Sequence, residues 1–241
     1  MILTRYLYPK HNVIYSLYVS LAIADAPQSL FWAYELYFSG FRTETVELLS
    51  EIYTNYYANE PIKPAFQKWL TKQTDKWRQD MQPEIVVTII QNMIRREPDY
   101  SNFCKKIPDL EWLVVANKSG GTIYVQKPIF VISKETPAQY HTQPAEYTKA
   151  WKLPRFVCQY MIYKDDSYKP IKLADYENWL YCASGSPIWR TRIKNHGGRI
   201  DDVEKCVKFV SEESQDEFMN WFSMDPDEQP LEIQLAWFGE P

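Results

Sequence analysis

The first third of the chain repeats one pattern, in which apolar residues spaced three and four apart are interrupted by turn-forming residues. The first apolar stripe follows Asn12, whose side chain we expect to cap a helix. Asp25 and Ala26 break this stripe, and Pro27 suits the first turn of a second helix. Gly40 should end the second helix, because glycine is favoured just beyond a helix C-terminus.

Three further helices are predicted in the same region. The third begins near Thr43 and carries an apolar stripe as far as Tyr56. The fourth is expected over 65–79 and the fifth over 84–96. Connections of only a few residues favour antiparallel packing of neighbouring helices. The sequence therefore predicts an N-terminal helical bundle over residues 1–105.

The remainder of the chain has a mixed pattern. Short β-type runs lie between residues 110 and 133, and the Pro-rich stretch 134–155 has the composition of a surface loop. Further elements are predicted after this loop, namely a strand over 155–163, helices over 173–183, 187–195 and 212–222, and a hairpin of two strands over 199–210. The fold class predicted is mostly α (α+β), with a mixed α/β unit over 106–241 that contains a small antiparallel β element.

Aromatic residues are unusually frequent and cluster in the second predicted helix. They make up 16% of the chain, and Tyr and Trp suit the half-wet surfaces of partner interfaces. One stretch carries more rings than one face of a helix can bury: Phe31, Trp32, Tyr34, Tyr37, Phe38 and Phe41. Some of these rings must lie at a second surface, which is either the seam with the rest of the chain or the groove of a partner protein. We predict a protein-binding surface at these six residues.

The fourth predicted helix is the candidate for nucleic-acid binding. The formal charge of -4 argues against a surface made throughout for nucleic acid, but it allows a local basic face. In this helix lysines recur at every fourth residue, and two tryptophans lie eight residues apart on an adjacent face. The set that could contact phosphates and stack on bases is Lys68, Trp69, Lys72, Lys76, Trp77 and Arg78. The alternative is a solvated lysine face whose tryptophans pack in the core.

The sequence contains no recognised catalytic motif. Its Gly-Gly pairs lack the patterns of phosphate-binding loops, and no GxSxG elbow is present. None of the three histidines has a His or a carboxylate at metal-ligand spacing, so His196 with Cys206 is the one pair that suggests zinc. The four cysteines lack CxxC spacing and are expected to be reduced and mostly buried. We predict no cofactor and no metal.

The chain also lacks signals for a membrane or for secretion. Its N-terminus has no apolar region of the kind found in signal peptides, and no apolar run approaches the ~20 residues of a membrane span. We therefore expect a soluble intracellular protein with no membrane partner. The sequence leaves its oligomeric state open.

Two segments carry a family resemblance. The N-terminal segment is SLFWAYELYFSGF at 29–41, followed by Tyr56-Tyr57-Ala58, and the C-terminal segment is WLYCASGSPIWRTRI at 179–193, followed by Gly197-Gly198 and residues 225–229. This set resembles an uncharacterised family of nucleocytoplasmic large DNA viruses. The resemblance implies no established activity and no catalytic residues. It implies an infected eukaryotic cell as the setting, with the cytoplasmic viral factory, the nucleus or the virion as the location.

A looser likeness concerns residues 13–58. Its spacing is carried by Leu21, Asp25, Glu35-Leu36, Phe41 and Glu44. This spacing is similar to one helical hairpin of the MA3 or HEAT type, which implies a protein-binding helical surface.

Three functional hypotheses follow from the sequence. The first is a virus-encoded, non-enzymatic adaptor that binds a viral or host protein through its aromatic residues. The alternative is an accessory factor in viral transcription, replication or translation that binds RNA or DNA through its basic helix. The third is an enzyme of unrecognised type, with His196, Cys206 or the surroundings of His141 as its candidate residues.

Overall fold

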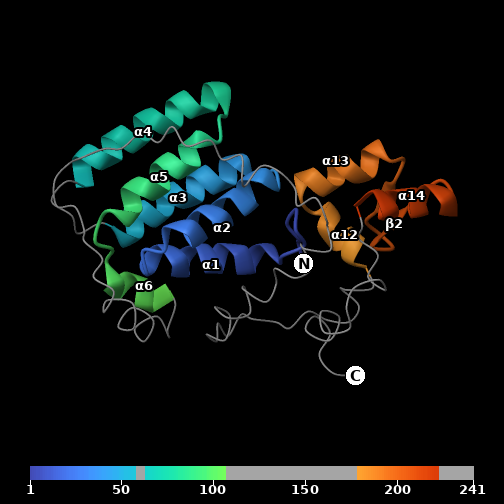
Figure 1. The fold of residues 1–241 in the computed structure, drawn as a ribbon, viewed down its shortest axis with the longest axis horizontal. Coiled ribbons are helices and arrows are strands. Elements are labelled where there is room, and N and C mark those ends of the chain that lie inside the picture. The colour runs from blue at the N-terminus through green and yellow to red at the C-terminus, as the bar shows by residue number, and fades with distance from the viewer. Residues whose placement is uncertain (58–62, 107–177, 223–241) are drawn as a thin grey trace.

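The structure, a computed structural model, describes residues 1–57, 63–106 and 178–222. These residues are mostly helical and include one two-stranded antiparallel sheet, which confirms the predicted mostly α (α+β) class (Figure 1). Within the same residues no helix has the length and apolarity needed to cross a membrane. The predicted strands and loop between residues 110 and 163 lie outside the described residues, as does the acidic segment 225–229.

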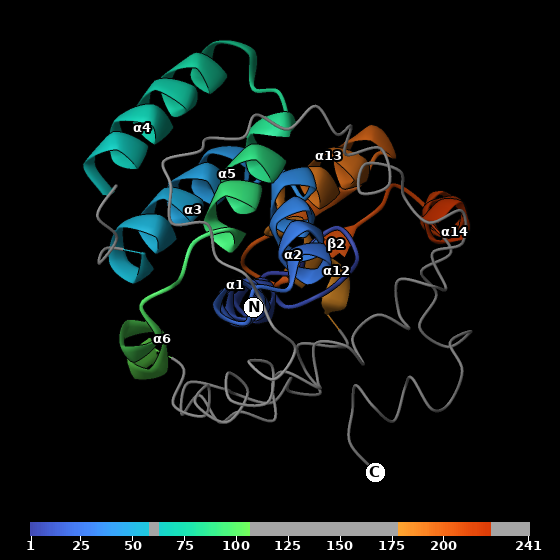
Figure 2. The ribbon, with the colours of Figure 1, turned by 60° about the vertical axis from the view of Figure 1, so that its left-hand side comes forward.

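Helices α1 to α6 form the N-terminal part. They are α1 (Lys10–Ala22), α2 (Ala26–Phe38), α3 (Arg42–Tyr56), α4 (Lys63–Asp80), α5 (Glu84–Ile94) and α6 (Tyr100–Lys106). Helix α2 is central, because it packs against α1, α3 and α5. Helix α4 packs on α3 and α5 and lies at the periphery in both views (Figures 1 and 2).

The observed ends of α1 and α2 can be compared with those predicted from the sequence. Asp25 caps α2 as its side chain accepts a hydrogen bond from the Gln28 backbone N–H at 3.1 Å. Gly40 lies just beyond α2 with a φ of 99°, as expected of a glycine that ends a helix. The prediction that Asn12 caps α1 was wrong. The helix begins earlier, at Lys10, because the Pro9 carbonyl already accepts from the N–H of Asn12.

The C-terminal part is smaller. It contains α12 (Trp179–Ser184), α13 (Pro187–Asn195), β1 (Arg199–Asp201), β2 (Cys206–Lys208) and α14 (Glu212–Phe222). The strands pair with Ile200 opposite Val207, so the predicted hairpin is confirmed with shorter strands. A second apolar cluster forms here around the buried Trp189 and Phe218.

The first nine residues join the two apolar clusters. Leu3 and Leu7 are buried in the cluster of the C-terminal part, whereas Tyr6 and Tyr8 belong to that of the helical bundle. The Trp189 indole donates to the carbonyl oxygen of Thr4 at 3.0 Å. The N-terminal segment therefore lies at the junction of the two parts (Figure 1). The predicted domain boundary at residue 105 stays a prediction, since residues 107–177 are not described.

A buried ion pair stabilises this junction. The Arg5 Nε donates to Glu35 Oε2 at 2.9 Å, and both side chains are almost completely excluded from solvent. The second carboxylate oxygen of Glu35 accepts from the Tyr6 backbone N–H at 3.1 Å. The backbone N–H of Arg5 donates to Ser39 Oγ at 2.8 Å. Burial raises the pKa of Glu35, while the charge and hydrogen bond of Arg5 oppose that rise.

Candidate functional site

Three of the six aromatic residues predicted to bind a partner are buried inside the chain. They are Trp32, Tyr34 and Tyr37, each no more than 1% exposed. The Tyr34 hydroxyl donates to the Pro83 carbonyl at 3.2 Å, and the Tyr37 hydroxyl donates to the Met81 carbonyl at 2.5 Å. The hydroxyl groups of Tyr34 and Tyr37 thus bind α2 to the connection between α4 and α5. Their prediction as a partner surface was wrong, because the chain itself covers them.

The other three aromatic residues are half-buried. Phe31, Phe38 and Phe41 pack against the apolar cluster of the helical bundle. The Arg5 guanidinium lies 5.0 Å from the ring centre of Phe38, and the Lys10 ammonium lies 4.0 Å from that of Phe41. The second surface required by the aromatic excess is therefore, for the most part, a seam within the chain.

Helix α4 has one apolar side and one basic side. Its buried residues are Phe66, Leu70, Thr74 and Trp77, spaced as a helical stripe that faces the bundle. Each lysine of the basic side follows a stripe residue by two positions, which turns it by about 200° around the helix. Lys68, Lys72 and Lys76 are accordingly exposed, and we call them the lysine row.

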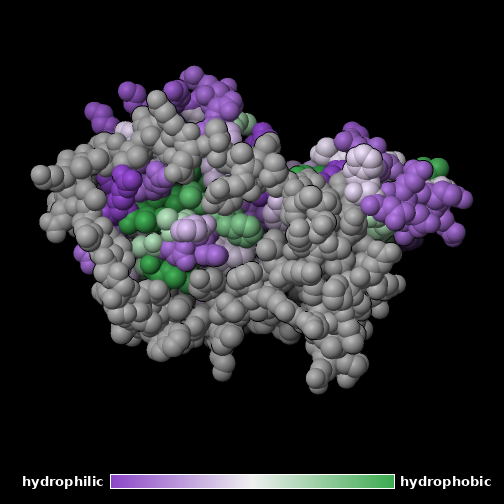
Figure 3. All heavy atoms as spheres, viewed as in Figure 1, coloured by the Kyte–Doolittle hydropathy of each residue, from purple (hydrophilic) through white to green (hydrophobic). Residues whose placement is uncertain are grey.

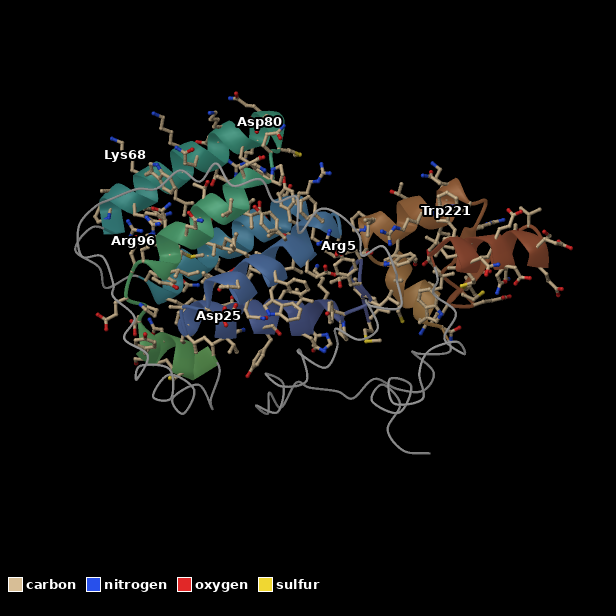
Figure 4. The ribbon with its side chains drawn as sticks, viewed as in Figure 1. Arg5, Asp25, Lys68, Asp80, Arg96 and Trp221 are labelled. Atoms are coloured by element: carbon tan, nitrogen blue, oxygen red, sulfur yellow. The ribbon has the colours of Figure 1, made fainter. Side chains whose placement is uncertain are left out.

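The ammonium groups of the lysine row are open to solvent. Among the residues that the structure describes, none of the three forms an ion pair. The nearby Arg78 differs, since it contacts Asp75 at 2.8 Å. Figure 4 shows Lys68 on the outer side of α4, away from the bundle, and Figure 3 shows hydrophilic side chains along the same edge. Within the described ranges the row therefore presents three charges without an ion-pair partner on a peripheral helix.

The two tryptophans of α4 do not share this exposure. Trp77 is buried, and its indole N–H donates to the Tyr37 hydroxyl oxygen at 3.1 Å. Trp69 is half-buried, with its ring centre 5.2 Å from that of Phe66. The prediction that Trp77 stacks on bases was wrong, because the apolar stripe of α4 includes it. Trp77 thus lies opposite the lysine row, whereas Trp69 lies beside the row, between the basic and the apolar sides of α4.

No family model, curated protein or solved structure matches the chain. Function is therefore inferred from the exposed and buried side chains of this chain.

Among the described residues, no group of possible metal ligands contains both His196 and Cys206. His196 Nδ1 lies 2.9 Å from the Arg192 carbonyl oxygen, and its ring contacts Phe218 with centres 5.5 Å apart. Cys206 instead neighbours Asp201 and Glu204, with the three ligand atoms within 4.8 Å of one another. His141 lies outside the described residues.

In the β1–β2 hairpin, Lys208 forms ion pairs with the two acidic residues near Cys206, Asp201 and Glu204. The Lys208 ammonium lies 3.0 Å from Asp201 and 2.5 Å from Glu204. Backbone N–H donation by Glu204, followed by the Lys208 contact, lowers the pKa of Asp201 to about 2. Asp201 Oδ1 also accepts from the N–H of Val203, so the carboxylate shapes the turn between the strands. We interpret this group as a structural element of the hairpin.

One group of residues has no signal in the sequence and is assembled only by the tertiary structure. Tyr181, Arg190, Asp202 and Lys205 line one cavity, together with Ile2 from the start of the chain. No motif links them, because they come from the N-terminus, two helices and the turn of a hairpin. Only the spatial arrangement of these segments reveals the group.

Proposed function

We propose that this protein binds the phosphate backbone of nucleic acid through the lysine row of α4, as an accessory factor in transcription, replication or translation. The observation that carries the proposal is the exposure of Lys68, Lys72 and Lys76 with no ion pair among the described residues. Residues 63–80 contain five basic and two acidic side chains, a net of +3, in a chain whose formal charge is -4. The positive charge is therefore local.

The geometry favours recognition without base readout. Successive lysines of the row are about 6 Å apart along the helix axis, given a rise of ~1.5 Å per residue. Such a row can neutralise several phosphates of one strand, and this contact carries little sequence information. Because Trp77 is buried, we expect no base stacking from it. Binding should tolerate many sequences and should weaken steeply as salt is added.

The test replaces all three lysines of the row by glutamine and measures binding to fluorescent RNA and DNA by anisotropy from low to moderate salt. Loss of three phosphate contacts should reduce the slope of log K against log salt by about 2.7 for a duplex or about 2.1 for a single strand. The matched control replaces three other exposed basic residues by glutamine: Lys105, Lys194 and Arg199. Both variants have the same net charge.

The comparison of these two variants decides the proposal. We expect the lysine-row variant to lose affinity and salt dependence, while the control variant stays close to the unmodified protein. Equal losses in both variants would mean that net charge alone acts, and unchanged binding in the lysine-row variant would refute the interface. Thermal unfolding of both variants checks that they are folded, since surface substitutions of this kind change stability by only about 0.5 kcal/mol.

A protein adaptor is the second candidate function. It is favoured by the exposure of Trp221, a large aromatic side chain that is 72% exposed at the end of α14. Following the viral resemblance, we propose an infected eukaryotic cell as the setting, with the viral factory, the nucleus or the virion as the location and a viral or host protein as the partner. Affinity purification of the tagged chain with and without nuclease tests it. Protein partners that survive nuclease and are lost with Trp221→Ala would support the adaptor, and partners lost with nuclease would favour the nucleic-acid interface.

A further inference from the structure

A cavity of about 480 Å³ lies where the N-terminus meets α12, α13 and the β1–β2 turn. Figure 1 shows α12 and α13 well separated from α4. The lining of the cavity includes Ile2, Tyr181, Cys182, Arg190, Asp202 and Lys205. The volume falls in the range of small-molecule sites. The lining combines an apolar wall with convergent polar groups, as ligand pockets do. The lysine row contributes nothing to it, so the cavity is independent of the proposed nucleic-acid interface.

The hairpin divides its charged residues between two sides. Lys208 pairs with both Asp201 and Glu204, as described above, and this group of three keeps a net charge of -1. This leaves Lys205 and Asp202 to line the cavity. Lys205 has a φ of 54°, a left-handed conformation that places it at the hairpin turn. Within the described ranges, Lys205 forms no ion pair with either acidic residue of that cluster.

Arg190 supplies a second cation from α13. Its Nε donates to the Ser184 carbonyl oxygen at 3.3 Å, which fixes the side chain against the end of α12. In the described parts of the chain Arg190 forms no ion pair. A guanidinium held by one edge presents its remaining N–H groups to an oxyanion in a fixed fork. Two cations and one carboxylate give the lining side chains a net charge of +1.

Asp202 makes the cavity more selective than a simple anion site. The Tyr181 hydroxyl donates to Asp202 Oδ1 at 3.3 Å. Loss of solvent and then the charge of Asp202 raise the pKa of Tyr181, so the phenol stays protonated and remains a donor. Asp202 repels a bare anion but accepts hydrogen bonds from hydroxyl groups. A ligand for this cavity therefore needs an anionic end and hydroxyl groups a few atoms away.

We propose that this cavity binds a phosphate monoester of a sugar or of a nucleoside. Arg190 and Lys205 hold the phosphate, and Asp202 accepts hydrogen bonds from the sugar hydroxyls. The apolar wall formed by Ile2 and Cys182 covers the uncharged part of the ligand.

The experiment is calorimetric titration of the full chain with four probes: adenosine 5′-monophosphate, ribose 5-phosphate, inorganic phosphate and adenosine. We expect one or both phosphate esters to bind at least about tenfold more tightly than inorganic phosphate and adenosine, since only the esters engage both the cations and Asp202. Equal binding of the two esters would identify the sugar phosphate as the recognised unit. Tighter binding of adenosine 5′-monophosphate than of ribose 5-phosphate would show that the cavity also contacts the base.

Variants separate the contributions. Arg190→Ala and Lys205→Ala should each weaken ester binding about tenfold, whereas Lys194→Ala, on α13 but outside the cavity lining, should not. Asp202→Asn should weaken the binding of the esters, because the carboxylate that accepts from their hydroxyl groups is lost. The affinity for inorganic phosphate should be unchanged or higher, because a repelling negative charge is removed. Inorganic phosphate bound as tightly as the esters, ester binding insensitive to Lys205→Ala, or no saturable binding would each overturn the proposal.

Discussion

Replacing Arg5 by leucine should destabilise the protein strongly. Leucine keeps much of the apolar bulk of the arginine stem but leaves the Glu35 carboxylate, which is 0% exposed, without its cationic partner. The Tyr6 N–H still donates to this carboxylate at 3.1 Å. Breaking a buried ion pair in this way costs about 3–5 kcal/mol. For a protein of this size the loss corresponds to a fall in Tm of roughly 6–20 °C.

The loss should depend on pH with a defined sign. Burial already raises the pKa of Glu35 above its ordinary value of 4.5, and removal of Arg5 raises it further. A carboxyl whose pKa is higher in the folded than in the unfolded state binds its proton more tightly when folded. Its contribution is therefore fully present below the ordinary value and is lost as the pH rises through the raised pKa. Arg5→Leu should be most destabilised at neutral pH and should recover on acidification.

Urea unfolding followed by tryptophan fluorescence, at several pH values, measures both effects. The double variant Arg5→Leu with Glu35→Leu is the matched comparison, since it removes the charge as well as its partner. We expect it to be more stable than Arg5→Leu alone. A loss below about 1 kcal/mol in Arg5→Leu, with no pH dependence, would show that the ion pair does not stabilise the junction as described.

Two further predictions concern the backbone and the hairpin. Gly40→Ala should destabilise the protein by more than about 1 kcal/mol in urea unfolding, because residue 40 has a φ of 99° and an added Cβ would lie 2.5 Å from the Pro187 Cβ; unchanged stability would contradict that contact. The Asp201 carboxyl should titrate near pH 2 by NMR, so that its contribution to the hairpin is present above its ordinary pKa of 3.8 and is lost as the pH falls through about 2. Lys208→Met should move this titration upward, and an unchanged value would exclude Lys208 as a cause.

The spacing of the lysines was enough to predict that the lysine row is exposed. The spacing of the tryptophans was not enough to predict whether they are buried. Lysines at every fourth residue share one side of any helix, and charged side chains favour the solvent side. A tryptophan is compatible with either a core or a wet surface. Trp77 lies in the apolar stripe of α4, and its indole N–H donates to the Tyr37 hydroxyl, forty residues earlier. No local pattern contains that pairing.

The sequence shows an excess of aromatic residues, but it does not show what these residues pack against. The six rings of α2 and its C-terminal end indicated a second surface, and local spacing could not distinguish a partner from the chain itself. The buried hydroxyls of Tyr34 and Tyr37 reach residues 81–83, and the Arg5 guanidinium covers Phe38. Such contacts join segments about thirty to fifty residues apart, so they arise only when the helices pack.

The sequence alone predicted the helical class, the break before Pro27 at which α2 begins, the end of α2 at Gly40 and the extent of α14. Capping, backbone conformation and apolar spacing act over a few residues, so a single chain segment contains them. Tertiary structure alone decided which aromatic residues are buried, the pairing of Arg5 with Glu35 and the joining of Arg190 and Lys205 around one cavity. These features depend on close contact between distant segments, and that contact is specified only when the apolar surfaces of the whole chain are buried together.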